Sequence, residues 1–334
     1  MANASTRPGP NNDITDVTGI AVGQTENETV RTGATVVLPE RPVICGCDVR
    51  GGGPGTRETD LLDPSTLVDR VDAVVLSGGS SYGLAAADGA AAWLGTQPGR
   101  GFTLVRAPGA PPSPIVPAAI LYDLANGGDK DWGEDPPYRR LGRKACMEAG
   151  GPVRLGLAGA GFGARAGAGP GGIGSASYVS GDGLAVGALV AVNSFGSVKM
   201  PGIDVFWAWP WEEDGEFGAR RPPADWRAVA DMPADTKLAA MAARQNTTIG
   251  VVAVSAALTQ PQARRVAVMA QDGVARAIRP VHGPTDGDAV FVLSTGDAAP
   301  ADPLALTRIG LLAADCVARA TARGVYEAER AQRD

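Results

Sequence analysis

The chain has 334 residues, of which 44% are hydrophobic, 20% charged and only 5% aromatic, and its 46 glycines and 26 prolines indicate many turns. The formal net charge of -6 argues against nucleic-acid binding, because that function requires clustered cations that displace phosphate counterions. A single histidine, His282, excludes metal sites that need two or more imidazoles, and four cysteines are too few for a disulfide framework. Length and composition therefore predict a soluble globular protein of one or two domains.

The N-terminal segment, residues 1–12, is rich in Pro, Asn and Ser and predicts a mobile tail, because it has little apolar surface to bury. It contains no hydrophobic stretch like that of a signal peptide, and no apolar run in the chain reaches the roughly 20 residues of a membrane span. We therefore expect a cytoplasmic protein without a membrane partner, whose ordered domain covers residues 13–334.

The first half of the chain predicts short strands that lead through a glycine turn into an alanine-rich helix, at residues 35–38, 43–49, 73–76 and 82–94. Alternation along the second strand places Cys45 and Cys47 on one face, where we expect buried structural thiols rather than a metal or redox site. A second helix and two small-residue strands follow, at residues 139–149, 153–160 and 184–192.

The second half opens with a stretch over residues 201–233 that lacks periodicity and holds four of the six tryptophans. We interpret it as a long surface excursion, whose tryptophans either pack it down or form an aromatic wall for a ligand: Trp207, Trp209, Trp211 and Trp226. Helices and strands alternate after it, with a helix at 234–244, a strand at 248–255, a helix at 260–278, a strand at 289–293 and a helix at 304–328.

Two glycine-containing motifs invite a functional interpretation. The glycine run over residues 156–172 is not followed by a helix, as a dinucleotide fingerprint requires, and predicts a close-packed backbone crossing instead. The segment Gly79-Ser80-Ser81-Tyr82-Gly83 matches the nucleophile elbow G-x-S-x-G. A serine hydrolase that uses Ser81 as nucleophile and His282 as base is therefore one hypothesis. The other is a tight turn whose free N–H groups bind a substrate carboxylate.

Residues Asn246-Thr247-Thr248 place two hydroxyls at the head of an apolar strand. By composition this is an ordinary β-branched strand. A threonine hydroxyl can also attack the preceding carbonyl, shift the acyl group from nitrogen to oxygen and so expose a new α-amine, whose pKa of about 8 lets it act as a base at neutral pH. One residue would then supply nucleophile and base. Asp286 and Asp288 lie in a later turn, where they form either a solvated turn or an acidic pair that tunes a neighbouring ammonium.

Several segments together resemble the DmpA-type aminopeptidases (L-aminopeptidase/D-esterase), a family that includes β-aminopeptidases and nylon-oligomer hydrolases. The resemblance extends from about Ile14 to the C-terminal helix and rests on residues 14–20, 48–52, 55–59, 77–84, 172–177, 246–249 and 286–288. It implies an α/β fold of the αββα four-layer sandwich type, made as one precursor that cuts itself between Asn246 and Thr247 into chains 1–246 and 247–334. It also implies a homotetramer of processed protomers.

The same resemblance assigns roles to individual residues. Thr247 is the implied nucleophile, Asn193 is the residue that stabilises the oxyanion, and Asp286 and Asp288 position the nucleophile and its amine. Tyr122 and Ser81 are the implied substrate-binding residues, and Ser81 lies in a turn typical of the family. No cofactor and no metal are implied, and the substrate is a small peptide or amide, possibly a nylon-type oligomer.

The chain departs from the family pattern at one place. Family members often carry a lysine in the glycine-rich segment, and residues 164–170 of this chain contain none. Arg165 supplies a charge at that place but cannot act as a base at neutral pH. Besides the self-processing amidohydrolase, three alternatives stay open: the Ser81/His282 hydrolase, an acyl transferase, and an unprocessed, non-catalytic ligand-binding protein.

Overall fold

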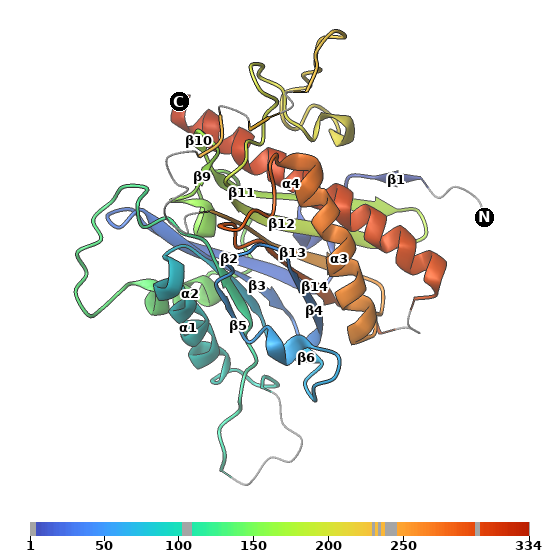
Figure 1. Cartoon of the computed structure of the whole chain (residues 1–334). Coiled ribbons are helices and arrows are strands. Elements are labelled where there is room, and N and C mark those ends of the chain that lie inside the picture. The colour runs from blue at the N-terminus through green and yellow to red at the C-terminus, as the bar shows by residue number, and fades with distance from the viewer. Residues whose placement is uncertain are drawn as a thin grey trace.

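Two β-sheets stack face to face, and a pair of helices covers the outer side of each sheet (Figure 1). The structure is a computed structural model that describes residues 5–101, 109–228, 231–232, 235–237, 246–297 and 301–333. The predicted αββα four-layer sandwich is therefore confirmed. None of the helices among these residues is long and apolar enough to cross a membrane.

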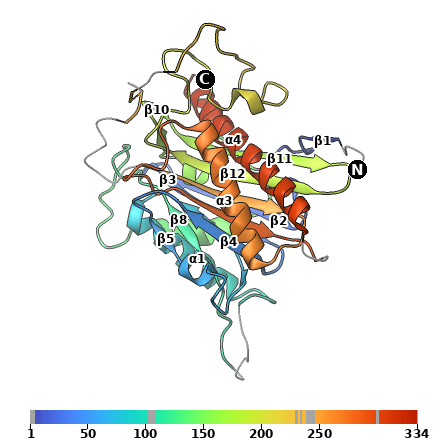
Figure 2. The ribbon, with the colours of Figure 1, turned by 45° about the vertical axis from the view of Figure 1, so that its right-hand side comes forward.

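In the described part of the chain the larger sheet has seven strands, four of them from the C-terminal half and three from the N-terminal half. Their order is β1 (Thr6–Arg7), β11 (Gly172–Ser180), β12 (Ala185–Asn193), β13 (Thr247–Val254), β14 (Ala289–Ser294), β4 (Val43–Val49) and β6 (Arg70–Val71). Neighbours are antiparallel except β13 and β14, which are parallel because helix α3 (Gln260–Ala277) forms the crossover between them. Helices α3 and α4 (Pro303–Arg333) lie side by side over this sheet (Figure 2).

The smaller sheet has five strands in the order β2 (Ile20–Asn27), β3 (Thr32–Pro39), β7 (Val74–Ser77), β8 (Ala118–Ile120) and β5 (Thr56–Arg57). Strands β7 and β8 are parallel, and the connection between them contains α1 (Ala85–Leu94), which packs with α2 (Tyr138–Met147) on the outer face. Strands β9 (Arg165–Ala166) and β10 (Gly169–Pro170) form a separate hairpin.

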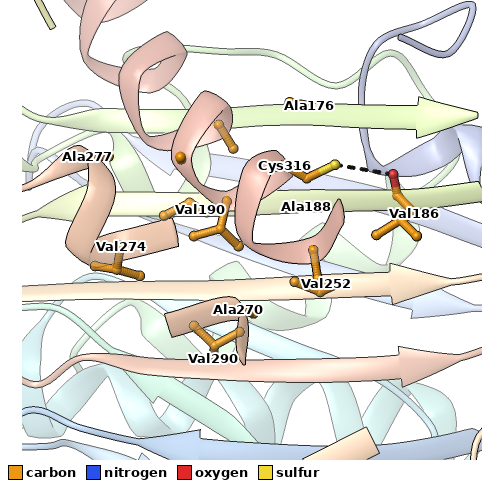
Figure 3. Packing of buried hydrophobic residues seen from close by; sticks show 14 of the residues in the cluster. Ala176, Val186, Ala188, Val190, Val252, Ala270, Val274, Ala277, Val290 and Cys316 are labelled. Carbon is orange, nitrogen blue, oxygen red and sulfur yellow. Dashed lines mark hydrogen bonds between the residues drawn. The ribbon is translucent and has the colours of Figure 1, made fainter. Parts of the chain in front are cut away.

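Alternating side chains of the central strands divide the core into three layers. On β13, Ile249 and Val251 point into the space between the sheets, whereas Val252 and Val254 point toward α3 and α4. Figure 3 shows this helix-facing layer, in which small residues of α3 and α4 meet the valines of the sheet. A third cluster lies between the five-stranded sheet and α1 and α2. Both faces of each central strand are therefore buried.

Glycines let backbones approach where the predicted motifs lie. A Cβ on Gly46 would lie 2.3 Å from the backbone nitrogen of Arg264 on α3, so only glycine fits between Cys45 and Cys47. Burial raises the pKa of both thiols, which is consistent with the expected structural role. In the glycine run, a Cβ on Gly172 would lie 2.3 Å from the carbonyl oxygen of Gly324 on α4, which confirms the predicted backbone crossing.

Some expectations from the sequence were wrong. Residues 5–12 are not a mobile tail: Thr6–Arg7 pairs with β11, and the Asn12 side chain accepts a hydrogen bond from Arg319 at 2.8 Å. Residues 1–4 lie outside the described part. Residues 153–160 form no strand, because the glycines there support a backbone crossing and a short 3-10 helix. Most of the predicted helix 234–244 lies outside the described residues.

The tryptophan-rich excursion (yellow in Figure 1) packs beside the C-terminal half of α4. Trp207 and Trp226 meet edge to face with ring centroids 5.6 Å apart. Glu216 of the excursion binds the fully buried Arg319 of α4 with an Nε to Oε1 distance of 2.6 Å. These contacts favour the interpretation that the excursion is packed down.

Candidate active site

The site forms where β12 ends and β13 begins. The two strands are antiparallel, and their register pairs Asn193 with Thr247. Both residues are buried, with 0% and 4% of their surface exposed. The structure thus brings together two residues that are 54 positions apart and that the sequence analysis had assigned to one site.

The Thr247 hydroxyl lies against the bond that was predicted to break. Its Oγ1 donates a hydrogen bond to the carbonyl oxygen of Asn246, and the backbone N–H of Gly287 donates to the same oxygen at 3.1 Å. Two donors on one carbonyl oxygen draw electrons from its carbon. The Asn246 side chain points elsewhere, since its Nδ2 donates to Thr285 Oγ1 at 3.2 Å.

The acidic pair lies directly beside this bond. Asp286 is paired with Asn246 in a parallel bridge, and Asp288 accepts the backbone N–H of Thr248 at 2.6 Å. Both carboxylates are almost fully buried, with 2% and 1% of the residue exposed. They are therefore not a solvated turn, and the second interpretation of these residues fits the structure better.

Each carboxylate is held by further donors. Asp286 accepts the backbone N–H of Gly283 at 2.8 Å and that of Phe195 at 3.3 Å. Burial, and then repulsion from Asp288, raises the pKa of Asp286 to about 6. This carboxyl group therefore changes its charge close to neutral pH.

A glycine loop supports the turn that carries the acidic pair. The backbone N–H of Gly53 donates to the carbonyl oxygen of Asp286 at 2.7 Å, and a Cβ on Gly51 would lie only 2.2 Å from that oxygen. Within the turn, a Cβ on Gly287 would lie 2.7 Å from Thr247 Oγ1. These contacts give a physical reason for the glycines in two of the segments that carry the family resemblance.

The amide of Asn193 is fixed on both sides. Its Nδ2 donates to the backbone carbonyl of Tyr122 at 3.0 Å. Its Oδ1 accepts hydrogen bonds from three donors: the backbone N–H of Arg165 at 2.9 Å, Lys237 Nζ at 3.2 Å and Asn126 Nδ2 at 3.4 Å. Tyr122 thus reaches the site through its carbonyl group, and Arg165 reaches it through its backbone rather than through its guanidinium.

Lys237 and Asn126 are site residues that the sequence analysis missed. Lys237 Nζ also donates to the backbone carbonyl of Asn193 at 2.9 Å. Burial lowers its pKa to about 7, although the charge of Asp286 acts in the opposite direction. No motif surrounds Lys237 in the sequence, so only the fold reveals that it contacts Asn193.

Ser81 and His282 do not come together. Ser81 lies exposed in the 3-10 helix η3 (Ser80–Leu84), and among the described residues no hydrogen bond joins it to His282. His282 Nδ1 instead lies 2.7 Å from Asp288 Oδ2. The turn before Ser81 has a structural cause, because Gly79 has a φ of +89° and its N–H donates to buried Asp123 at 2.8 Å.

Among the described residues, no group of three or more His, Cys, Asp or Glu side chains forms a candidate metal site.

Two solved structures share this architecture. A β-aminopeptidase from Burkholderia sp. aligns with a TM-score of 0.69 and 22% identity, covering 96% of this chain and 88% of that one. The L-aminopeptidase D-Ala-esterase/amidase from Ochrobactrum anthropi, described as a new variant of the Ntn hydrolase fold, aligns with a TM-score of 0.65 and 23% identity over 96% and 87%. The fold is therefore of the N-terminal-nucleophile hydrolase type, as expected.

Sequence comparisons define the family. The model of peptidase family S58 matches residues 12–334. An uncharacterized aminopeptidase from Mycobacterium tuberculosis (strain ATCC 25618 / H37Rv) is 44% identical, with 95% of this chain and 94% of that protein covered. A 6-aminohexanoate-oligomer endohydrolase from Kocuria sp. (strain KY2) is 28% identical over 84% and 74%. The chain belongs to peptidase family S58 and is an amide-bond hydrolase, which confirms the predicted resemblance.

Proposed function

We propose that the protein is a self-processing amidohydrolase that removes N-terminal residues from short peptides or cleaves small amide oligomers, with Thr247 as its nucleophile. The observation that carries this proposal is the contact between Thr247 Oγ1 and the carbonyl of Asn246. The hydroxyl is next to the carbonyl carbon that it must attack, and Gly287 donates to the oxygen on which negative charge would develop.

Processing on this proposal proceeds by an acyl shift. Thr247 Oγ1 bonds to the carbonyl carbon of Asn246, the carbon–nitrogen bond breaks, and the Thr247 nitrogen takes up the proton that the hydroxyl loses. Water then hydrolyses the resulting ester, which leaves a carboxylate on Asn246 and a free α-amine on Thr247. The buried acidic pair supports this chemistry, because its negative charge favours an ammonium that forms beside it.

The mature enzyme would then use the exposed Thr247. Its unprotonated α-amine accepts the proton of the hydroxyl, the hydroxyl attacks the substrate carbonyl, and water releases the acyl group. Asn193 would bind the oxyanion, and its pairing opposite Thr247 supports this role. An amine in place of water would make the same acyl-enzyme a transferase. The names of the relatives suggest aminopeptidase substrates or 6-aminohexanoate oligomers.

The test of this proposal is a denaturing gel of the purified protein with N-terminal sequencing. A cut between Asn246 and Thr247 divides the 33.9 kDa chain into pieces of about 25 kDa and about 9 kDa. The small piece should begin Thr247-Thr248-Ile249. Thr247→Ala should leave one full-length band and abolish hydrolysis. A single full-length band from an active parent protein would refute self-processing, and an inactive full-length parent would favour a non-catalytic ligand-binding protein.

We also propose that processed protomers assemble as a homotetramer in the cytoplasm. The family resemblance is the support for this assembly. Light scattering of the processed protein should give about four times the protomer mass, and a mass equal to one protomer would contradict the proposal.

A further inference from the structure

We propose that Lys237 is a positioning residue of the Thr247 site, whose ammonium holds and polarises the amide of Asn193. This inference rests on the proposed function of Thr247 and Asn193. Lys237 Nζ donates to two oxygens of the same residue, the backbone carbonyl at 2.9 Å and Oδ1 at 3.2 Å. A lysine nitrogen that donates hydrogen bonds to both oxygens of Asn193 fixes the rotation of the side-chain amide.

The charge of Lys237 has a direct effect on the amide that it holds. An asparagine amide has one acceptor oxygen and two N–H donors, so a cation on Oδ1 draws electrons from the nitrogen and strengthens its N–H donors. Nδ2 is the end of Asn193 that donates, since it already binds the Tyr122 carbonyl. A stronger and fixed Nδ2 donor is what an oxyanion opposite Thr247 requires.

The backbone also anchors Lys237 at this place. Its N–H donates to the carbonyl oxygen of Phe195 at 3.1 Å, and the N–H of Phe195 donates to Asp286 at 3.3 Å. Phe195 therefore connects the lysine to the acidic pair. The segment that carries Lys237 also precedes the predicted cut, so the lysine would remain on the large chain after processing.

The surroundings make this ammonium titrate near neutral pH. Burial lowers the pKa of Lys237 to about 7, the carboxylate of Asp286 opposes that change, and the guanidinium of Arg165 adds to it. The positive charge on the Lys237 nitrogen that binds Asn193 is therefore lost as the pH rises through about 7. An arginine at this position keeps its charge over the whole neutral range.

The experiment compares self-cleavage rates of the full chain, made by cell-free synthesis and followed on denaturing gels between pH 6 and pH 9. The variants are Lys237→Met, Lys237→Arg and, as a matched control, Lys144→Met, which changes an exposed lysine on α2. We expect Lys237→Met to slow cleavage at least tenfold at pH 6.5, and Lys237→Arg and Lys144→Met to stay within about threefold of the parent. Thermal melts of all variants report whether the fold is kept.

The pH profile separates positioning from mere packing. The ratio of the Lys237→Arg rate to the parent rate should rise as the pH increases above 7, because only the parent loses its cation. A ratio that does not change with pH, or a Lys237→Met variant that cleaves like the parent, would overturn the inference. Thr247→Ala is measured in the same assay. Cleavage in that variant would refute Thr247 as the nucleophile, and the self-cleavage rates of the lysine variants could still be compared with that of the parent.

A second measurement does not depend on cleavage. In protein labelled with nitrogen-15 at lysine, the Nζ resonance that disappears in Lys237→Met should titrate near pH 7. Titration in the ordinary lysine range above pH 10 would overturn the predicted loss of the Lys237 charge near pH 7, even if the parent proved to be uncleaved.

Discussion

Replacing Asp286 by asparagine should change how the stability of the protein depends on pH. Asp286 is 2% exposed, and its pKa is raised from 3.8 to about 6, mainly by burial and then by Asp288. A carboxyl whose pKa is higher in the folded than in the unfolded chain stabilises the fold at low pH, and this contribution is lost as the pH rises through 6. The parent should therefore lose stability relative to Asp286→Asn between acidic and neutral pH.

The size of this change follows from the two pKa values. A difference of about two units corresponds to about 3 kcal/mol in total, of which about 1 kcal/mol is already lost at pH 4.5, so about 2 kcal/mol remains to be lost by pH 7.5. Gly283 and Phe195 each donate a backbone N–H to this carboxylate. Because the variant replaces one of the two acceptor oxygens by an NH2 group, it also loses one of these hydrogen bonds. That loss, about 1–3 kcal/mol, is the same at every pH and cancels when two pH values are compared.

The assay is urea unfolding at pH 4.5 and pH 7.5, with Thr247→Ala in both proteins so that each remains one chain. The stability of the asparagine variant minus that of the parent should rise by about 2 kcal/mol between the two pH values. Protein concentration must be held constant, because assembly would add to the apparent stability. A difference that stays constant within about 0.5 kcal/mol, or that falls, would refute the assignment of a raised pKa to Asp286.

Three further variants test other parts of the site. Asp288→Asn should lower the rates of self-cleavage and hydrolysis at least tenfold, or about 1.4 kcal/mol, because it removes the charge that binds Thr248 N–H at 2.6 Å. Gly287→Ala should slow self-cleavage strongly, because its Cβ would lie 2.7 Å from Thr247 Oγ1. Ser81→Ala should change neither rate by more than about twofold, because Ser81 is exposed and not bonded to His282 among the described residues.

Each of these variants needs its own control. Light scattering must show that the variant assembles like the parent before its rate is compared, and unchanged kinetics in a well-assembled Asp288→Asn protein would deny the acidic pair a role. Normal cleavage by Gly287→Ala would mean that the turn can move away from Thr247. Loss of hydrolysis in folded Ser81→Ala would revive the serine-hydrolase hypothesis.

Local sequence patterns predicted several of the regular elements, and the family resemblance predicted the candidate residues at their ends. Continuous apolar runs bounded by polar residues such as Asn193 and Asp288 predicted β12, β13 and β14, because a strand that is buried on both faces needs apolar side chains at successive positions. Amphipathic spacing likewise predicted α3 and α4. Strands β2 and β11 were not predicted, because glycine, serine and threonine interrupt the run of apolar residues in both.

Only the tertiary structure decided how these residues meet. The pairing of Asn193 with Thr247 depends on strand register, which sets which residues lie opposite each other and which no local pattern records. The burial of Asp286 and Lys237, and with it their pKa values near neutral pH, arises from chain segments far apart in sequence. The sequence by itself therefore specified a threonine, an amide and two carboxylates, and the fold added the lysine that contacts the amide and the close contacts that require glycine at positions 51 and 287.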